Sequence, residues 1–347
     1  MKLSIVVPVY NMAADGKLHY CMDSLLAQTL TDYEIIAVDD ASTDHSLEIL
    51  REYERKYPGR VRVIESAENH HQGGARNLGI RAAQGEYLGL MDSDDWASPE
   101  MFSKLLKKAE ETGADVVGCD YSLVESHTME PGKVIRINTS EQTGKLNTEK
   151  KRLLLLQSGS MVVKIYRREI IIKNELWFPQ DIFYEDNCMS PIWLLFCTHF
   201  ERVEEPLYYY YQHEVSTVHT VSLSRCRDRM KAMELLIEKS KKYGFYEDYR
   251  PELEFKFTEL YLVNTLFSCM SGIMKRKFRF VGELCRGQKQ YFPYFQDNAY
   301  YRDRIGAEEQ KLIRILMRSR MLFFAYYYVL RAYRQLRKRF SRNRKVY

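Results

Sequence analysis

The sequence lacks the marks of a disulfide-rich, zinc-binding or membrane-spanning protein. Its seven cysteines are an odd number and form no Cys-x-x-Cys pair, which argues against a disulfide framework and a structural zinc site. No apolar run reaches the roughly 20 residues that a membrane-spanning helix needs. The first apolar run, residues 3–10, is too short and wrongly flanked for a signal peptide. We therefore expect a cytoplasmic protein.

Acidic residues are missing from the C-terminal part. Residues 311–347 hold 12 of the 52 Lys and Arg and no Asp or Glu. The other residues hold the remaining 40 bases against 47 acids, a net charge of −7. The apolar run 321–330 is too short to cross a bilayer, but a basic helix rich in aromatic residues can lie among lipid headgroups.

This tail predicts peripheral contact with an anionic membrane, at the inner face of the cytoplasmic membrane. Two alternatives stay open: the apolar run could pack on the protein's own core, or the C-terminal helices could form a homo-oligomer. A basic tail can also bind nucleic acid, but we do not expect a nucleic-acid partner here.

Strand-like and helix-like patterns alternate over residues 1–124. Five apolar, strand-like runs are separated by helical spacing or by polar turns, and they lie at 3–11, 33–40, 60–66, 86–95 and 114–124. This order predicts an α/β fold with a mostly parallel sheet and helices on both faces. Residues 125–222 mix both patterns, and from about 225 the pattern is helical. We expect one domain over 1–222, with halves at about 1–124 and 125–222, and a helical region over 223–347 with a basic amphipathic tail.

Carboxylates follow two of the predicted strands. Asp39 and Asp40 end the second strand, and Asp92, Asp94 and Asp95 end the fourth. Ligands of such sheets bind at the carboxyl ends of the strands. A cation is the simplest way to hold several carboxylates together, and oxygen ligands favour Mg2+ or Mn2+. The alternative is structural: Asp94 and Asp95 would cap the helix that follows, and Asp40, with Ser42 and Thr43, would cap the helix after the second strand.

Seven motifs in order resemble those of family 2 glycosyltransferases with the GT-A fold. They span residues 3–217 and read "SIVVPVYN", "IIAVDDASTD", "GGARNLGI", "LMDSDDW", "VKIYRREII", "FPQDIFYEDN" and "LYYYYQH". The resemblance implies a GT-A, Rossmann-like sheet. The glycine pair in "GGARN" is not a Gly-x-Gly-x-x-Gly fingerprint, which disfavours a nicotinamide oxidoreductase.

The resemblance also implies a nucleotide-sugar site. Tyr10 would lie against the base, with Pro8 shaping the turn, Asn11 fixing the loop and Asp39 accepting from a base N–H. Arg76, at a helix N-terminus, would contact the nucleotide or its diphosphate, with Gly73 and Gly74 allowing close backbone approach. Asp92 would touch the ribose or a metal-bound water, and Asp95 the donor sugar. Tyr10 could instead be a packing aromatic.

The implied metal and catalytic residues complete the site. Asp94, with Asp92, would coordinate Mn2+ or Mg2+ on the diphosphate, and His213 is a further candidate ligand that could equally be structural. Asp186 would be the general base, with Glu185 orienting it or binding the acceptor; both could instead form a helix N-cap pair. Lys164 and Arg167 are expected to be surface charges.

The predicted function is inverting, metal-dependent glycosyl transfer from a nucleotide sugar, with a UDP-sugar as the expected donor. The acceptor would be a saccharide or a lipid-linked acceptor, in bacterial cell-surface polysaccharide biosynthesis. The alternative is a non-catalytic nucleotide-sugar-binding or scaffold protein of the same fold.

Overall fold

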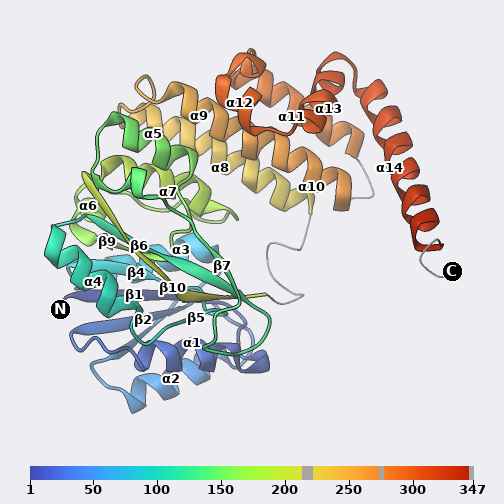
Figure 1. The fold of residues 1–347 in the computed structure, drawn as a ribbon. Coiled ribbons are helices and arrows are strands. Elements are labelled where there is room, and N and C mark those ends of the chain that lie inside the picture. Colours follow the sequence, from blue (N-terminus) through green and yellow to red (C-terminus); the bar gives the residue numbers. More distant parts are fainter. Residues whose placement is uncertain (213–221, 273–276, 344–347) are drawn as a thin grey trace. The chain divides into compact units, whose positions relative to one another are not determined.

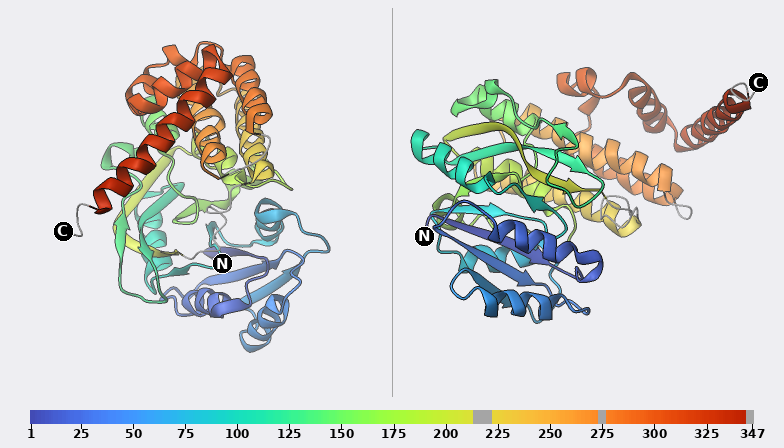
Figure 2. Two further views of the ribbon diagram at one scale, coloured as in Figure 1. Left: turned by 90° about the vertical axis from the view of Figure 1, so that its right-hand side faces the viewer. Right: turned by 60° about the horizontal axis from the view of Figure 1, so that its bottom comes forward.

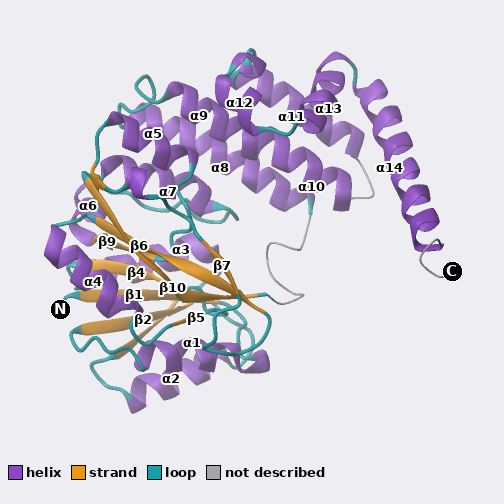
Figure 3. Cartoon of the chain, in the orientation of Figure 1, coloured by secondary structure: helices purple, strands orange, loops and turns teal. Residues whose placement is uncertain are grey.

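A computed structural model describes residues 1–212, 222–272 and 277–343 (Figure 3). The chain forms two compact units. Unit 1 comprises Met1–Thr220 and Lys231–Tyr249, and unit 2 comprises Val221–Met230 and Arg250–Tyr347. Helix α8 (Leu223–Lys242) contributes residues to both units. The functional division expected at residue 222 stays a prediction.

Unit 1 is built on one sheet, in which ten strands are described (Figure 1). Their order is β3-β2-β1-β4-β9-β6-β10-β5, with β7 beside β6 and β8 beside β10. The strands are β1 (Leu3–Val9), β2 (Tyr33–Asp39), β3 (Val61–Glu65), β4 (Tyr87–Leu90), β5 (Trp96–Ala97), β6 (Val116–Val124), β7 (Lys133–Ile135), β8 (Gly144–Lys145), β9 (Lys164–Arg167) and β10 (His199–Tyr211).

The centre of the sheet is parallel. Strand β1 pairs with β2 on one side and with β4 on the other, both in parallel register. Every residue of β1, β2 and β4 is buried, as a strand covered on both faces requires. Strand β9 is antiparallel to both of its neighbours, β4 and β6. The prediction of a mostly parallel α/β sheet is confirmed.

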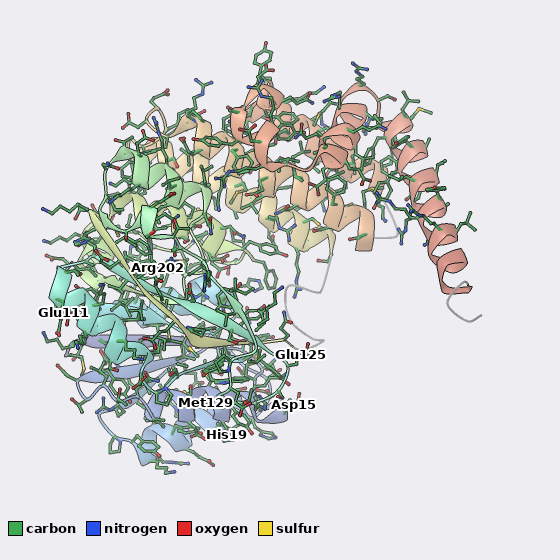
Figure 4. All side chains as sticks on the ribbon, in the orientation of Figure 1. Asp15, His19, Glu111, Glu125, Met129 and Arg202 are labelled. Atoms are coloured by element: carbon green, nitrogen blue, oxygen red, sulfur yellow. The ribbon has the colours of Figure 1, made fainter. Side chains whose placement is uncertain are left out.

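Helices pack against this sheet (Figure 1). Helix α3 approaches β1 closely because Gly79 has no side chain: a Cβ there would lie 2.3 Å from Cγ1 of Val6. Side chains fill the layers between this sheet and its helices (Figure 4). The helices of unit 1 are α1 (Lys17–Leu26), α2 (Ser46–Lys56), α3 (His71–Ala82), α4 (Met101–Thr112), α5 (Thr148–Leu156), α6 (Arg168–Lys173) and α7 (Glu185–Phe196), with 3-10 turns at Ala14–Gly16 and Ser140–Gln142.

The alternative in which Asp40, Ser42 and Thr43 cap the helix after β2 is wrong. Helix α2 begins at Ser46, and the Ser42 hydroxyl instead accepts from the N–H of Asn11 at 3.0 Å. The Asn11 side chain in turn accepts from the N–H of Thr43 at 2.8 Å, so Asn11 does fix the loop. Asp40 is buried and accepts from the N–H of His70 at 3.0 Å. These polar groups therefore join three loops at the carboxyl edge instead of capping α2.

Unit 2 is helical in its described part (Figure 2, orange and red). Its buried core includes Cys226, Cys269 and Phe280. Searched over the described residues, no helix is both long and apolar enough to cross a membrane. Besides α8, the helices are α9 (Arg250–Phe257), a π-helical stretch at Thr258–Asn264, α10 (Thr265–Gly272), α11 (Lys277–Tyr291), a 3-10 turn at Phe295–Asp297, α12 (Ala299–Arg304), α13 (Ala307–Arg318) and α14 (Arg320–Asn343).

Candidate active site

The acidic side chains gather where the central strands end. Parallel register sets Val9 of β1 beside Asp39 of β2, and Val6 beside Leu90, the last residue of β4. The residues after these three strands therefore meet at one edge of the sheet, as the sequence pattern predicted.

Asp39 has an oxygen without a partner. Its side chain is 1% exposed, and Oδ2 accepts from the N–H of Ser42 at 3.1 Å. Oδ1 is buried and has no hydrogen-bond partner within the described residues. A buried, unpaired carboxylate oxygen is costly, so its presence points to a donor that is supplied from outside. Tyr10, which follows β1 at the same edge, is 45% exposed, whereas Pro8 is buried within the strand.

Asp92 is bound by two side chains of α3. Its Oδ1 accepts from Nη2 of Arg76 at 2.9 Å and from Nε2 of Gln72 at 2.6 Å. Burial raises the pKa of Asp92, and the nearby Asp94 raises it further, while Arg76 opposes both effects. The sequence reasoning did not single out Gln72, although it lies directly before the glycine pair.

Arg76 bridges the two acidic motifs. It is 3% exposed, and its Nη1 donates to Oε1 of Glu185 at 2.7 Å while Nη2 holds Asp92. The Arg76 guanidinium thus joins Asp92 to Glu185, which is 109 positions away from Arg76 in the chain. Where an anionic ligand was expected, the structure supplies the chain's own carboxylates.

Gly73 serves the same junction, whereas a Cβ on Gly74 would lie 2.2 Å from Cβ of His70. A Cβ on Gly73 would lie 2.3 Å from the carbonyl oxygen of Pro179 and 3.0 Å from Cγ of Glu185. The close approach that was expected toward a ligand is therefore an approach to the segment before α7. Any larger residue at Gly73 would push this segment away from α3.

Glu185 and Asp186 form the first turn of α7. The turn begins after Tyr184, which has a positive φ of 66°. Glu185 is 3% exposed, and burial raises its pKa to about 7, with Asp186 contributing and Arg76 opposing. Asp186 is close enough to raise the pKa of Asp92 as well. The strand-end motif and the α7 motif are thus one cluster.

Asp95 faces inward from the same turn. It is 2% exposed, and its two oxygens accept from the Tyr208 hydroxyl at 2.5 Å and from the N–H of Tyr211 at 2.9 Å. Helix α4 starts after Glu100 without a side-chain cap, so the capping alternative for Asp94 and Asp95 is wrong. Asp95 instead ties the turn to β10, a role that the tyrosine run gave no sign of.

The donor set has the chemistry of a magnesium or manganese site that a substrate completes. No group of three or more His, Cys, Asp or Glu in the described ranges is arranged to hold a metal ion. Asp92 and Asp94 are two carboxylates in one tight turn, and such sites take their other ligands from water and phosphate oxygens. These residues therefore fit an ion that binds together with a diphosphate. His213 lies outside the described residues.

Sequence comparison identifies the chain's relatives. The profile described as "Glycosyl transferase family 2" matches residues 4–174. EpsH of Bacillus subtilis (strain 168), provisionally named a glycosyltransferase, is 30% identical over 85% of this chain and 85% of its own. The chain belongs to glycosyl transferase family 2. Another relative, the uncharacterized glycosyltransferase YibD of Escherichia coli (strain K12), is 33% identical, and the match covers 62% of each chain.

Solved structures share the fold of this family 2 chain. S. aureus TarS 1-349, crystallised with UDP-GlcNAc, superposes with a TM-score of 0.58 at 20% identity, over 89% of this chain and 78% of the TarS 1-349 chain. The mannosyltransferase PcManGT of Pyrobaculum calidifontis, in complex with GDP-Man and Mn2+, gives a TM-score of 0.51 at 16% identity, over 85% and 82% of the two chains. At these identities the likeness concerns the fold.

Proposed function

We propose that this family 2 chain is an inverting, metal-dependent glycosyltransferase that uses a nucleotide sugar, with a UDP-sugar as donor. The observation that carries the proposal is the Arg76 bridge, which holds an acidic strand-end motif and the acidic start of α7 in one cluster. A nucleotide-sugar enzyme needs both groups, since one faces the leaving diphosphate and the other the acceptor.

The donor end of the site follows from Asp39. Its unpaired Oδ1 would accept from an N–H of the base, such as N3–H of uracil, while Tyr10 would stack on the ring. Asp94, with Asp92, would hold Mn2+ or Mg2+ against the diphosphate. When bound, such an ion takes up the charge that develops on the departing diphosphate. TarS is solved with UDP-GlcNAc, and PcManGT with GDP-Man and Mn2+, which supports a nucleotide sugar and a divalent ion here.

The acceptor end of the site centres on Asp186. In the proposed step, an acceptor hydroxyl oxygen bonds to the anomeric carbon while the bond from that carbon to the diphosphate oxygen breaks. The hydroxyl proton passes to Asp186, and the bonding electron pair leaves with the diphosphate. Glu185, held by Arg76, would fix the first turn of α7 and so orient Asp186. The acceptor would be a saccharide or lipid-linked acceptor of cell-surface polysaccharide synthesis.

The test replaces the base without altering its shape. Asp186→Asn is expected to slow UDP release from UDP-GlcNAc or UDP-glucose, with water as acceptor, by about 100-fold or more, because general-base catalysis contributes on that order. UDP affinity should stay unchanged. Asp181→Asn is the matched control, because Asp181 lies in the same segment with a 67% exposed side chain. Full turnover in Asp186→Asn would overturn the assignment, and a parent that binds UDP without any turnover would favour the non-catalytic alternative.

A further inference from the structure

The C-terminal helix α14 packs on the other helices of unit 2 mainly along one side. Phe323 is fully buried, and the Arg320 guanidinium lies 4.6 Å from the ring of Phe278 and donates to its carbonyl at 3.3 Å. Arg334 pairs with Glu308 of α13. These contacts fix which side of α14 faces the other helices of its unit.

The other side of α14 is apolar and exposed. Met321, Leu322 and Val329 are 74%, 63% and 70% exposed. At 3.6 residues per turn, these side chains and their neighbours fall within an arc of roughly 140° that contains no charged residue and runs for about 22 Å. We call this surface the α14 face; it comprises Met321, Leu322, Tyr326, Val329, Tyr333 and Leu336.

The surroundings of the α14 face carry positive charge. Residues 311–347 include twelve Lys and Arg and no acid. Arg337 is exposed on α14, next to the border of the face where Tyr326 and Tyr333 lie. An apolar helix face with tyrosines at its border and cations around it has the composition of a helix that lies in a bilayer interface. Tyr333 can place its ring in the acyl boundary and its hydroxyl in water, whereas the Tyr326 hydroxyl accepts from Nζ of Lys311 of α13 at 3.0 Å, which adds a cation at this border.

We propose that the α14 face docks the chain on an anionic lipid bilayer. A second copy of the chain fits less well, because pairing two such helices would bring together two strongly basic segments that hold no acid. Nucleic acid would engage the cations but would leave the apolar arc exposed. A bilayer with anionic headgroups satisfies both features, since the acyl region accepts the arc and the headgroups accept the cations.

The docking surface goes beyond the proposed transfer reaction. It rests on unit 2 residues alone, and its test measures no turnover, so either proposal can fail while the other holds. Together they would bring the enzyme to the surface where lipid-linked acceptors are displayed.

Vesicle flotation of the full chain tests the proposal. The probes are vesicles of phosphatidylcholine alone and of phosphatidylcholine with phosphatidylglycerol. The parent is expected to float with the anionic vesicles and to be released by high salt. The triple replacement Leu322→Gln, Val329→Gln and Leu336→Gln should weaken binding about 10- to 100-fold, since it removes three side chains from apolar burial. Arg337→Gln should weaken binding to the anionic vesicles selectively.

A matched control separates this face from general surface hydrophobicity. Met129→Gln, Val134→Gln and Tyr294→Gln remove three apolar side chains that are 49%, 42% and 77% exposed elsewhere (Met129 is labelled in Figure 4). The control should float like the parent, and circular dichroism should show that both triple variants fold. Equal flotation of the parent and the α14 triple variant would overturn the proposal. Two other results would also overturn it. In the first, the parent does not bind vesicles but is a dimer that the α14 triple replacement turns into a monomer. In the second, the parent binds RNA and does not bind vesicles.

Discussion

Among single residues, Asp39 carries the clearest sign of a missing ligand. One of its oxygens is satisfied by Ser42, and the other is buried without a partner in the described part of the chain. Its neighbour Asp40 is also buried but is satisfied by the N–H of His70. The contrast between adjacent carboxylates suggests that Asp40 maintains the loop and that Asp39 is kept for a base.

Asp39→Asn tests this difference. The asparagine oxygen can still accept from Ser42, but its amide group no longer offers the second acceptor. We expect UDP affinity, measured by calorimetry with Mn2+, to fall about 10- to 100-fold, because a hydrogen bond to a charged group contributes about 1.5–3 kcal/mol. Glu65→Gln is the control, since Glu65 lies beside Asp39 in register but is exposed. Unchanged affinity in Asp39→Asn would remove Asp39 from base recognition.

Glu185 is the second residue whose environment has a measurable consequence, a pH dependence of the protein's stability. Burial raises its pKa from 4.5 to about 7, even though Arg76 is hydrogen-bonded to it. Between these two pH values the folded protein holds a proton that the unfolded chain releases. Its contribution to stability is therefore fully present below pH 4.5 and is lost as the pH rises through 7.

Replacing Glu185 with Gln should remove that pH dependence. Gln keeps the shape and an oxygen for Arg76 but cannot ionise. We expect the free energy of unfolding of the parent, relative to Glu185→Gln, to fall by on the order of 3 kcal/mol between about pH 4.5 and pH 8. Urea unfolding across that range measures the difference. Parallel pH profiles of the two proteins would contradict the buried, neutral Glu185.

At the scale of an element, β9 depends on a buried lysine. Lys164 is fully buried, and its ammonium donates to the carbonyls of Ser158 at 2.9 Å and Ser160 at 2.6 Å. The expectation of a surface charge is wrong for Lys164, because the apolar strand on which it lies is buried and its side chain is buried with it. Arg167, by contrast, is partly exposed and pairs with Glu86 and Asp115. The loop that Lys164 holds precedes β9, whose first residues pair with the end of β4.

Lys164→Met therefore has a predictable pH signature. Burial lowers the pKa of Lys164 from 10.5 to about 7, so above pH 7 the unfolded chain binds a proton that the folded protein does not. Stability contributed by the parent residue should rise with pH between about 7 and 10. The unfolding free energy of the parent minus that of Lys164→Met should therefore increase over that range. Lys173→Met, at a 70% exposed lysine of α6, should show no such trend; a constant difference for Lys164→Met would contradict the assignment.

For the fold as a whole, the sequence could predict a mostly parallel α/β sheet and the edge of the sheet where the acids gather. The local apolar runs and the carboxylates after them were enough to place Asp39 and Asp92 at one edge of the sheet, because parallel strands end at the same edge. The Arg76 bridge could not be predicted, since Glu185 is 109 residues away and no local pattern encodes that contact. The contacts of Asp95 could not be predicted either, because its partners lie on β10 and depend on where that strand stands in the sheet.

Ligand-induced stabilisation of the full chain would show whether this edge binds a nucleotide. A ligand present at about 100 times its dissociation constant stabilises the native state by about 3 kcal/mol, which would raise the melting temperature by about 5 °C. We expect UDP with Mn2+ to give such a shift, and Asp92→Ala with Asp94→Ala to remove it. Asp297→Ala with Asp303→Ala makes the same charge change at exposed positions of unit 2 and should keep it. If the Asp92 and Asp94 variant melted with the parent's shift, these acids would have no part in holding the ion and the diphosphate, and the proposed transfer reaction would lose its leaving-group site.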